Sequence, residues 1–380
     1  MKRSQKPQLK IRKWAAFLVL VCTAGLVLWP HRLNEGQYMI NPVTDDKYSV
    51  NSLSALKSNI SPQNEFAETL DQKLQSENYI GTALIVHHNK IILQKGYGEA
   101  DEQQHRHNDA STLFQLASIE KAMTAVLIMQ QIESGKLSFD SKLSDYYPNV
   151  VNADNITIRD LITMSSGLSQ RIQPTTFESE EDNIEFSAIH AVKIGEPGNG
   201  IGWSYQPVNY RLLAGILMKL TNKTFAVLLN QVFNNTYHLD ARSYQDFIKS
   251  KHRSIGYDNS YDKAYGENQV IYNRETGTGN IAMTTGALYR FYRLMIDKVI
   301  IKHPSQLWQT RVGETYAAGM YHEGKYFNAH GILPGFEPTV VISNTGQDAV
   351  ILLSNQYYKN HSFQPLAREL FTKMTAIPTK

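Results

Sequence analysis

The segment "FQLASIEKAMTAVLIMQQIESGKL", residues 114–137, is the most informative part of this sequence for the fold. From about Ser118 onward its apolar residues recur at helical spacing, at Ala122, Ala125, Val126, Met129 and Ile132. Gly135 then provides a stop signal. Because the segment is apolar on nearly every side, it predicts a buried, central helix. A charged residue, Lys121, nevertheless stands in the first turn of this helix.

Ser118 and Lys121 are three residues apart, so on a helix their side chains share a face and can meet. A serine becomes a nucleophile when a base takes its proton, and a lysine in a buried or positively charged environment can be that base. The start of the helix would also stabilise an oxyanion. The spacing alone is not specific, since Ser54 and Lys57 repeat it in a polar region. The aromatic residue before the motif and the apolar helix after it favour Ser118 over Ser54 as the nucleophile. They also favour an activated serine over a surface salt bridge as the explanation for Lys121.

The overall charge excludes one class of partner. The 380 residues carry a net charge of +3, and no basic stripe follows the first 32 residues, which argues against nucleic-acid binding. The single cysteine, Cys22, rules out a disulfide within one chain, so an exported domain must be held together by its core.

The N-terminal region predicts a membrane anchor. Residues 1–13 contain six basic side chains, and residues 14–30 form an uncharged run just long enough to span a bilayer. The positive-inside rule makes residues 1–13 a cytoplasmic tail, residues 14–30 a transmembrane signal anchor, and the remainder extracytoplasmic. A cleaved signal peptide is the alternative, but no convincing small-x-small cleavage site follows the run. Residues 31–62 are polar and predict a tether, which leaves residues 63–380 as the domain.

Strand patterns occur at both ends of this domain. Short apolar runs at 79–86 and 90–97 predict a hairpin, and two more strands follow at 338–343 and 349–354, before a closing helix. Helices dominate between them, including 156–165 and 208–221. We therefore expect an α/β fold of the α+β kind: one antiparallel sheet built from both termini, with flanking helices and an inserted all-helical region.

The run from Thr112 to Leu168 carries a resemblance to a known family. It includes the phenylalanine before Ser118, "GKLSFD" after the helix, the proline of "YYP", and "TIRDLITMSSGL", in that order. This resembles the serine beta-lactamase and penicillin-binding-protein superfamily, in the branch related to class C beta-lactamases, DD-peptidases and serine esterases. The resemblance extends from about Tyr79 to the C-terminal helix. It implies an antiparallel-sheet domain and an all-helical domain with the site between them, Ser118 as nucleophile and Lys121 as base.

A second motif is partly kept. In the stretch "EPGNGIGWSYQPVNY", residues 196–210, the resemblance implies that Tyr205 is a second base or proton relay. Pro207 stands where the family has an asparagine that clamps the substrate amide and the lysine. Asn209 lies nearby but aligns with a loop position.

The third motif lies in "YFNAHGILPGFEP", residues 326–338. Aligned without a gap, it becomes Ala329-His330-Gly331, with alanine at the cationic position. A shift by one residue would make His330 the motif histidine but would leave Ile332 where glycine belongs. His330 is thus either a pocket residue or an ordinary strand histidine. The resemblance makes the Ile332 amide the second oxyanion donor.

Two departures, Pro207 and Ala329, point to the substrate. The cation and the amide that they replace hold the ligand carboxylate and peptide group in penicillin-binding relatives, and their loss should favour esters. We therefore expect an extracytoplasmic serine hydrolase, anchored through residues 14–30, that acts on a cell-envelope polymer, closest in character to esterases that remove D-alanyl groups from teichoic acids. The alternatives are a DD-carboxypeptidase or penicillin-binding protein, and a non-catalytic wall-binding domain.

The sequence predicts neither a cofactor nor a metal site. His87 and His88, and likewise His105 and His107, lack companion ligands at useful spacing and are expected to be solvated loop residues.

Overall fold

The computed structural model of the protein describes residues 48–198, 202–258, 261, 263–265, 269–357 and 361–379. The predicted cytoplasmic tail, the transmembrane anchor and the first part of the tether lie outside these residues. Within the described part of the chain, no single helix is long and apolar enough to cross a bilayer. Helix α6 (Val208–Thr221) and the following segment Phe225–Thr236 meet that criterion only as a pair, bent by 78°.

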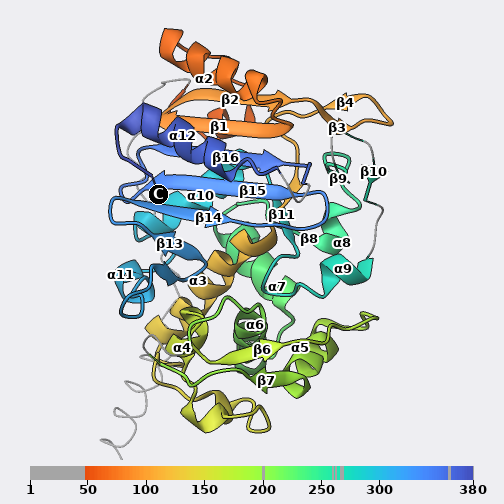
Figure 1. Cartoon of the computed structure of the whole chain (residues 1–380), viewed down its shortest axis with the longest axis vertical. Helices are drawn as coiled ribbons and strands as arrows, with labels where there is room; N and C mark the ends of the chain where they lie inside the picture. Colours follow the sequence, from red (N-terminus) through yellow and green to blue (C-terminus); the bar gives the residue numbers. More distant parts are fainter. Residues whose placement is uncertain are drawn as a thin grey trace, which may run out of the picture. The chain divides into compact units, whose positions relative to one another are not determined.

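A seven-stranded antiparallel sheet forms the upper part of Figure 1. Its order is β12-β13-β14-β15-β16-β1-β2. Strand β1, near the start of the domain, pairs with β16, near its end, with Thr82 opposite Leu353. The prediction of one sheet built from both termini is therefore confirmed. The strands are β1 (Gly81–His87), β2 (Lys90–Tyr97), β12 (Tyr316–Ala317), β13 (Met320–His322), β14 (Tyr326–His330), β15 (Glu337–Ser343) and β16 (Ala349–Ser354).

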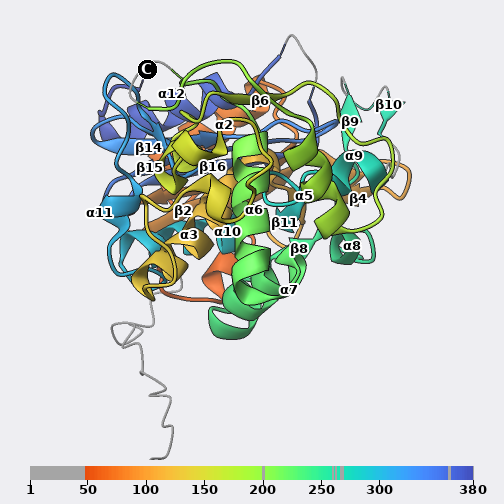
Figure 2. The ribbon, with the colours of Figure 1, turned by 90° about the horizontal axis from the view of Figure 1, so that it is seen from below.

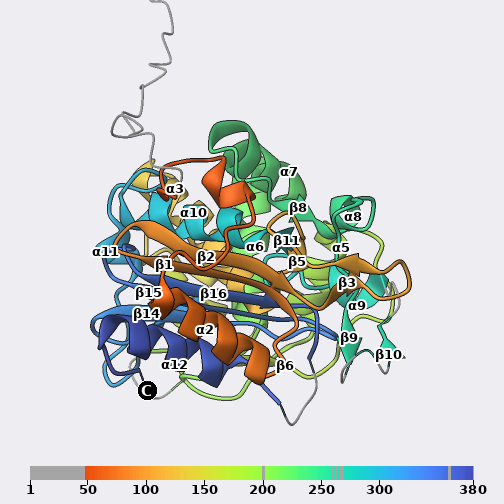
Figure 3. The same ribbon diagram turned by 90° about the horizontal axis from the view of Figure 1, so that it is seen from above.

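Helices cover both faces of this sheet, as Figure 3 shows. Because successive residues of a strand point to opposite faces, Leu84 and Ile85 of β1 belong to different cores. Ile85 packs with α2 (Glu65–Ser76) and α12 (Gln364–Thr375). Leu84 packs in the larger core with α3 (Glu120–Glu133) and α10 (Thr285–Ile296). The prediction of a buried helix after Ser118 is confirmed, since α3 is buried from Glu120 to Met129.

The helices between the two halves of the sheet form a separate group around α6, nearest the viewer in Figure 2. Helix α3 lies between this group and the sheet (Figure 1). The helix predicted at 156–165 is shorter than expected, because Met164 adopts a left-handed φ of 58°. The group comprises α4 (Ile158–Ile162), β6 (Leu168–Gln170), α5 (Glu180–Ile189), β7 (Ala191–Lys193), α6 and α7 (Phe225–Leu229).

Short elements connect these layers. They are η1 (Ala55–Lys57), β3 (Glu99–Asp101), β4 (Arg106–His107), β5 (Phe114–Gln115), η2 (Ala117–Ile119), η3 (Leu143–Asp145), η4 (Ala153–Asn155), the π-helical turn Asn230–Thr236, β8 (Arg242–Ser243), α8 (Tyr244–Phe247), β9 (Tyr257–Asp258), β10 (Lys263–Ala264), α9 (Gln269–Asn273), β11 (Ile281–Met283) and α11 (Pro304–Leu307).

The predicted tether ends earlier than residue 62. Val50, Leu56 and Ile60 are buried in the main core, and Gln94 donates to the Leu56 carbonyl over 3.1 Å. These apolar residues follow no helical or strand period, so the sequence pattern alone suggested an unpacked segment. The boundary predicted at residue 63 is therefore wrong, since the folded domain already includes residues 48–62.

Candidate active site

Ser118 lies in a tight turn between β5 and α3. Strand β5 pairs with β11 and fixes the approach of the chain. Ala117 then adopts a left-handed φ of 45°, a conformation that costs a non-glycine residue about 1–2 kcal/mol. Gly331 packs so closely here that an added Cβ would lie 2.8 Å from the Ser118 nitrogen. The turn is therefore held by close backbone packing, and it leaves the Ser118 side chain partly exposed.

The predicted pair meets as expected. Lys121 Nζ lies 2.8 Å from Ser118 Oγ, in the first turn of α3. Only 1% of Lys121 is exposed, and its second hydrogen-bond partner is the Thr278 carbonyl, at 3.1 Å. The Ser54–Lys57 repeat of the motif has no such setting, because Lys57 is exposed and Ser54 bonds Ser52. Burial and direct contact with the hydroxyl are what a lysine base requires.

Two carboxyl groups flank Lys121, the buried Glu120 and the partly buried Glu275. Glu120 is fully buried, and this burial raises its pKa well above the ordinary value although it accepts a hydrogen bond from the Ile281 amide. Burial also acts to raise the pKa of Glu275, but Arg211, Thr278 and Lys121 together outweigh it and hold that pKa below the ordinary value. The two carboxyl groups therefore have pKa values shifted in opposite directions, upward for Glu120 and downward for Glu275.

Tyr205 lies beside Lys121, as predicted. The lysine Nζ is 5.3 Å from the centroid of the Tyr205 ring, and that ring packs edge-on against Tyr316. Within the described residues, the Tyr205 hydroxyl bonds neither Ser118 nor Lys121. Catalytic hydrogen bonds often tighten only when substrate is bound, so this position is compatible with a proton relay.

Ser118 opens into a cleft with a volume of about 650 Å³. The residues that line it come from η2, the loop before α6, strands β12 to β14 with their turns, and α12. They are Ser118, Tyr205, Tyr316, Gly319, Tyr321, Glu323, Asn328, His330, Ile332, Gln364 and Arg368.

The alternation of side chains along β14 shows which residues of the third motif lie on the nucleophile's side of the sheet. Ala329 packs in the core shared with α3, on the nucleophile's side of the sheet, whereas His330 faces the α12 side. Gly331 meets the turn before Ser118, which is the place that the alignment without a gap gives to the motif glycine. His330 is a cleft residue, and its Nε2 lies 2.9 Å from the fully buried Glu337. His330 therefore lines the cleft and also pairs with a neighbouring strand, and its role toward substrate stays a prediction.

Ile332 begins the loop after β14. It is 44% exposed and lines the cleft, while the preceding Gly331 amide still donates to the sheet, to the Pro338 carbonyl at 3.0 Å. Within the described residues, the Ile332 amide donates to no acceptor. The role of oxyanion donor that the resemblance implies for this amide stays a prediction.

The second motif lacks its amide clamp. Pro207 is the N-cap residue of α6 and has no amide side chain to offer. Asn209 is fully buried and binds Ser166 and the Gln206 carbonyl, so it does not line the cleft. No described residue of this loop replaces the clamp on Lys121.

Sequence reasoning missed three features of the site. Thr278 and Arg368 belong to no recognised motif, and both reach the site from segments far away in the sequence. The left-handed Ala117 has no sequence signal either, since alanine rarely adopts this conformation.

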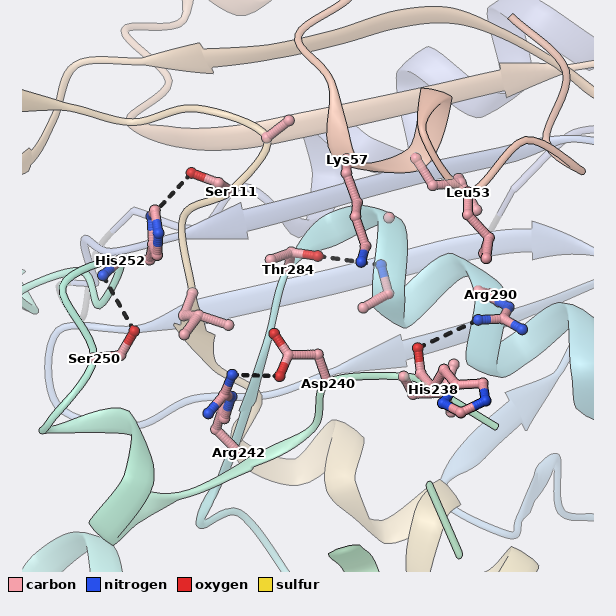
Figure 4. Close-up of a pocket in the computed structure, with 16 residues that line it drawn as sticks. Leu53, Lys57, Ser111, His238, Asp240, Arg242, Ser250, His252, Thr284 and Arg290 are labelled. Atoms are coloured by element: carbon pink, nitrogen blue, oxygen red, sulfur yellow. Dashed lines mark hydrogen bonds and ion pairs between the residues drawn. The ribbon is translucent and has the colours of Figure 1, made fainter. Parts of the chain in front are cut away.

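A second cavity, of about 200 Å³, lies between η1 and α10 (Figure 4). Leucine and alanine side chains form much of its lining, and charged groups surround them. Asp240 pairs with Arg242, while Arg290 donates to the His238 carbonyl at 3.3 Å. The cavity shares no residue with the Ser118 cleft.

The fold brings Asp348 to His87 and His88, a companion that sequence spacing did not suggest. The candidate ligand atoms of these three residues lie within 4.8 Å of one another. Asp348 accepts from the His88 amide at 3.1 Å and lies 2.8 Å from His87 Nδ1. These bonds give the carboxylate a structural role in holding the β1–β2 turn, so His87 is not the solvated residue that was expected.

The fold and the Ser118–Lys121 pair define a class: serine hydrolases whose nucleophile is activated by a lysine on the following helix turn. Residues 66–372 match the model of the family described as Beta-lactamase, and the chain belongs to this family. The family's members are serine hydrolases.

The chain is similar in sequence to two bacterial proteins and in structure to a third. The chain is 29% identical over 321 residues to the protein PbpX, named as a penicillin-binding protein, of Bacillus subtilis (strain 168), covering 82% of this chain and 80% of that one. It is 25% identical over 331 residues to the teichoic acid D-alanine hydrolase of Staphylococcus aureus (strain NCTC 8325 / PS 47), with coverage of 80% and 81%. The crystal structure of FmtA from Staphylococcus aureus superposes with a TM-score of 0.74 at 20% identity, covering 84% and 88%.

Proposed function

We propose that this protein is a membrane-anchored, extracytoplasmic esterase that removes D-alanyl esters from teichoic acid through an acyl-enzyme on Ser118. The observation that carries the proposal is the contact between Ser118 and the buried Lys121, at 2.8 Å, in a cleft whose third motif has Ala329 in place of a cation. The similarity to a relative named as a teichoic acid D-alanine hydrolase supports the choice of substrate.

In the acylation step, the neutral Lys121 amine takes the proton of Ser118 while Oγ attacks the ester carbonyl carbon. The negative charge that develops on the carbonyl oxygen is stabilised by the free Ile332 amide and by the start of the α3 helix. When the tetrahedral intermediate collapses, the polyol oxygen leaves and takes a proton delivered through Tyr205.

In the deacylation step, water enters the cleft and attacks the Ser118 acyl ester. The same lysine and tyrosine accept the water proton and return one proton to Ser118 Oγ as D-alanine is released. An ester needs less help than a peptide in this cycle, because an alkoxide is a better leaving group than an amide anion. The absence of an amide clamp at Pro207 therefore matters less for an ester.

A DD-carboxypeptidase is the second candidate, and His330 is the observation that favours it. This histidine lines the same cleft as Ser118, and its Nε2 lies 2.9 Å from a carboxylate oxygen of the buried Glu337. It would have to hold the peptide carboxylate in place of the missing third-motif cation.

D-alanine release distinguishes these candidates. The full-length protein in detergent is incubated with purified lipoteichoic acid and, separately, with a pentapeptide wall fragment, and Ser118→Ala serves as the control. We expect serine-dependent release from the polymer and none from the peptide. Release from the peptide alone would replace the esterase proposal with the carboxypeptidase. Release of D-alanine from neither substrate, together with a Ser118 that does not react with an activated acyl probe, would favour a non-catalytic binding domain.

A further inference from the structure

The catalytic lysine is held from an unexpected direction. Two groups in the described residues bond Lys121 Nζ: the Ser118 hydroxyl, its reaction partner, and the Thr278 backbone carbonyl. The asparagine that would fix this amine from the second motif is absent, since Pro207 takes its place. The orientation of Lys121 therefore depends on what holds the Thr278 carbonyl.

The turn that carries Thr278 is fixed by Glu275. The Thr278 hydroxyl donates to Glu275 Oε2 at 2.7 Å, and the Thr278 amide donates to the Glu275 carbonyl at 2.8 Å. Gly277, at a φ of 71°, lets the turn approach α6, because an added Cβ there would lie 2.5 Å from Ala214 Cβ. Its carbonyl also accepts from the Thr124 hydroxyl at 2.8 Å. The turn is thus tied to both α3 and α6.

Glu275 is itself anchored by a buried arginine. Arg211, on α6, is 2% exposed and donates to Glu275 Oε1 at 2.9 Å. The same guanidinium donates to the side-chain oxygens of Gln170 and Gln173, at 3.1 and 3.0 Å. A guanidinium with several fixed acceptors is a rigid support, because its planar donors allow little rotation. Removing one partner of such a pair would leave a buried charge unpaired.

We propose that the Arg211–Glu275 ion pair is a positioning device for Lys121, acting through Thr278 in place of the lost second-motif clamp. This inference rests on the proposed role of Lys121 as the base for Ser118. The device connects the inserted helical group to the nucleophile: α6 carries both Pro207 at its start and Arg211 one turn later. Glu275 and Arg211 do not line the cleft, so they act on the amine and not on the substrate.

The test measures how fast Ser118 reacts, without requiring the natural substrate. The full-length protein is reacted with a fluorophosphonate probe across a pH series, and the rate is taken per molecule that is finally labelled. Glu275→Gln keeps the shape of the side chain and removes its charge. We expect its labelling rate to fall about 100-fold, the scale expected for a misplaced catalytic group. We also expect the acidic limb of its pH profile to move to lower pH, because a negative charge near the amine has been removed.

Two further variants separate positioning from general damage. Thr278→Val removes the hydroxyl that ties the turn to Glu275 and should slow labelling, whereas Thr278→Ser keeps this hydroxyl and should restore the rate. Asp71→Asn is the matched control, since Asp71 is a buried carboxylate bonded to Lys95 at 3.0 Å on the far face of the sheet. It should leave the rate and the pH profile unchanged.

The outcomes are distinct. A Glu275→Gln protein with the wild-type rate and pH profile would overturn the positioning role while leaving Ser118 as the nucleophile. A fall in rate equal to that of Asp71→Asn, with no movement of the pH profile, would also overturn it. Failure of the wild-type protein to label at Ser118 would instead refute the proposed function on which the inference rests.

Discussion

The two walls of the cleft differ in how far their charged side chains are buried. On one wall, formed by Ser118 and Tyr205 with Lys121 behind them, the lysine is buried and its hydrogen bonds are made within the protein. We call this the nucleophile wall. On the other, formed by Tyr321, Glu323, Asn328, His330 and Arg368, the charged groups are partly exposed. We call this the strand wall.

Arg368 illustrates the difference. Its side-chain hydrogen bond within the described residues is a long one, 3.5 Å from the guanidinium to Asn328 Oδ1. Arg211, by comparison, has three acceptors within 3.1 Å. A charge satisfied inside the protein positions a reacting group, while a charge left open toward a cleft is available for a ligand. The comparison therefore assigns chemistry to the nucleophile wall and recognition to the strand wall.

The largest effect should follow from Lys121→Met, which keeps the length of the side chain and removes the base. We expect the rate of ester hydrolysis to fall by about 10⁴-fold or more, because serine loses its proton acceptor. Thermal unfolding should occur at the same or a higher temperature, since a buried amine no longer has to be accommodated. Rate and melting temperature are measured on the same preparation. A Lys121→Met protein that keeps more than about one hundredth of the wild-type activity would contradict the assignment of chemistry to the nucleophile wall.

Tyr205→Phe should have a smaller effect. Removing the hydroxyl should lower kcat about 10²- to 10³-fold, the range for loss of a positioned proton donor, and change KM little. The ring and its packing against Tyr316 remain, so unfolding should be unaffected. The acylation step of an ester with a good leaving group sharpens the test, because that leaving group needs no proton and acylation should proceed almost normally. An equal loss in the acylation rate of both esters would argue against proton delivery through Tyr205.

The nucleophile wall was predictable from sequence to a large extent. Ser118 and Lys121 are three residues apart on one helix, so local spacing alone places them together. The helix is apolar throughout, which correctly indicated its burial. Tyr205 needed the flanking residues of its motif, since a tyrosine by itself has no functional signal. The strand patterns at the two ends of the chain also correctly indicated one sheet built from both termini, although not its strand order.

The strand wall and the support of Lys121 were not predictable in this way. Arg368 is 250 residues from Ser118 in the sequence, and only the packing of α12 on the sheet brings it to the cleft. Glu275 lies on an irregular turn, where no periodicity indicates which way a side chain points. Whether His330 or Ala329 faces the nucleophile depends on a strand register that shifts every side chain when it moves by one residue.

Strand β13, which contributes Tyr321 to the strand wall, also carries a histidine that should make the fold sensitive to acid. Burial lowers the pKa of His322 to about 4, against 6.5 ordinarily, although its ring also bonds the Ala317 carbonyl. Below pH 6.5 the unfolded chain therefore gains a proton that the folded protein does not, and stability falls as the pH drops toward 4. Between pH 7 and 5 this should cost up to about 2 kcal/mol of unfolding free energy. The variant His322→Gln should escape this part of the loss in urea titrations, whereas His303→Gln, at an exposed histidine, should not. Equal losses of unfolding free energy in the wild type, His322→Gln and His303→Gln would contradict the assignment of this acid sensitivity to His322.

The smallest expected effect tests recognition directly. Arg368→Gln should raise KM for lipoteichoic acid about tenfold with little change in kcat, because its partly exposed side chain lines the cleft and can reach the polymer's phosphates. A small neutral ester should be hydrolysed as by the wild type, and added salt should weaken polymer binding less in the variant. Arg290→Gln, at the second cavity, is the matched control for a general loss of positive charge. If Arg290→Gln raises KM as much as Arg368→Gln, attraction by the whole protein explains the binding. If Arg368→Gln impairs hydrolysis of the neutral ester as much as hydrolysis of the polymer, Arg368 supports the fold of the cleft. The assignment of recognition to the strand wall and chemistry to the nucleophile wall would then be wrong.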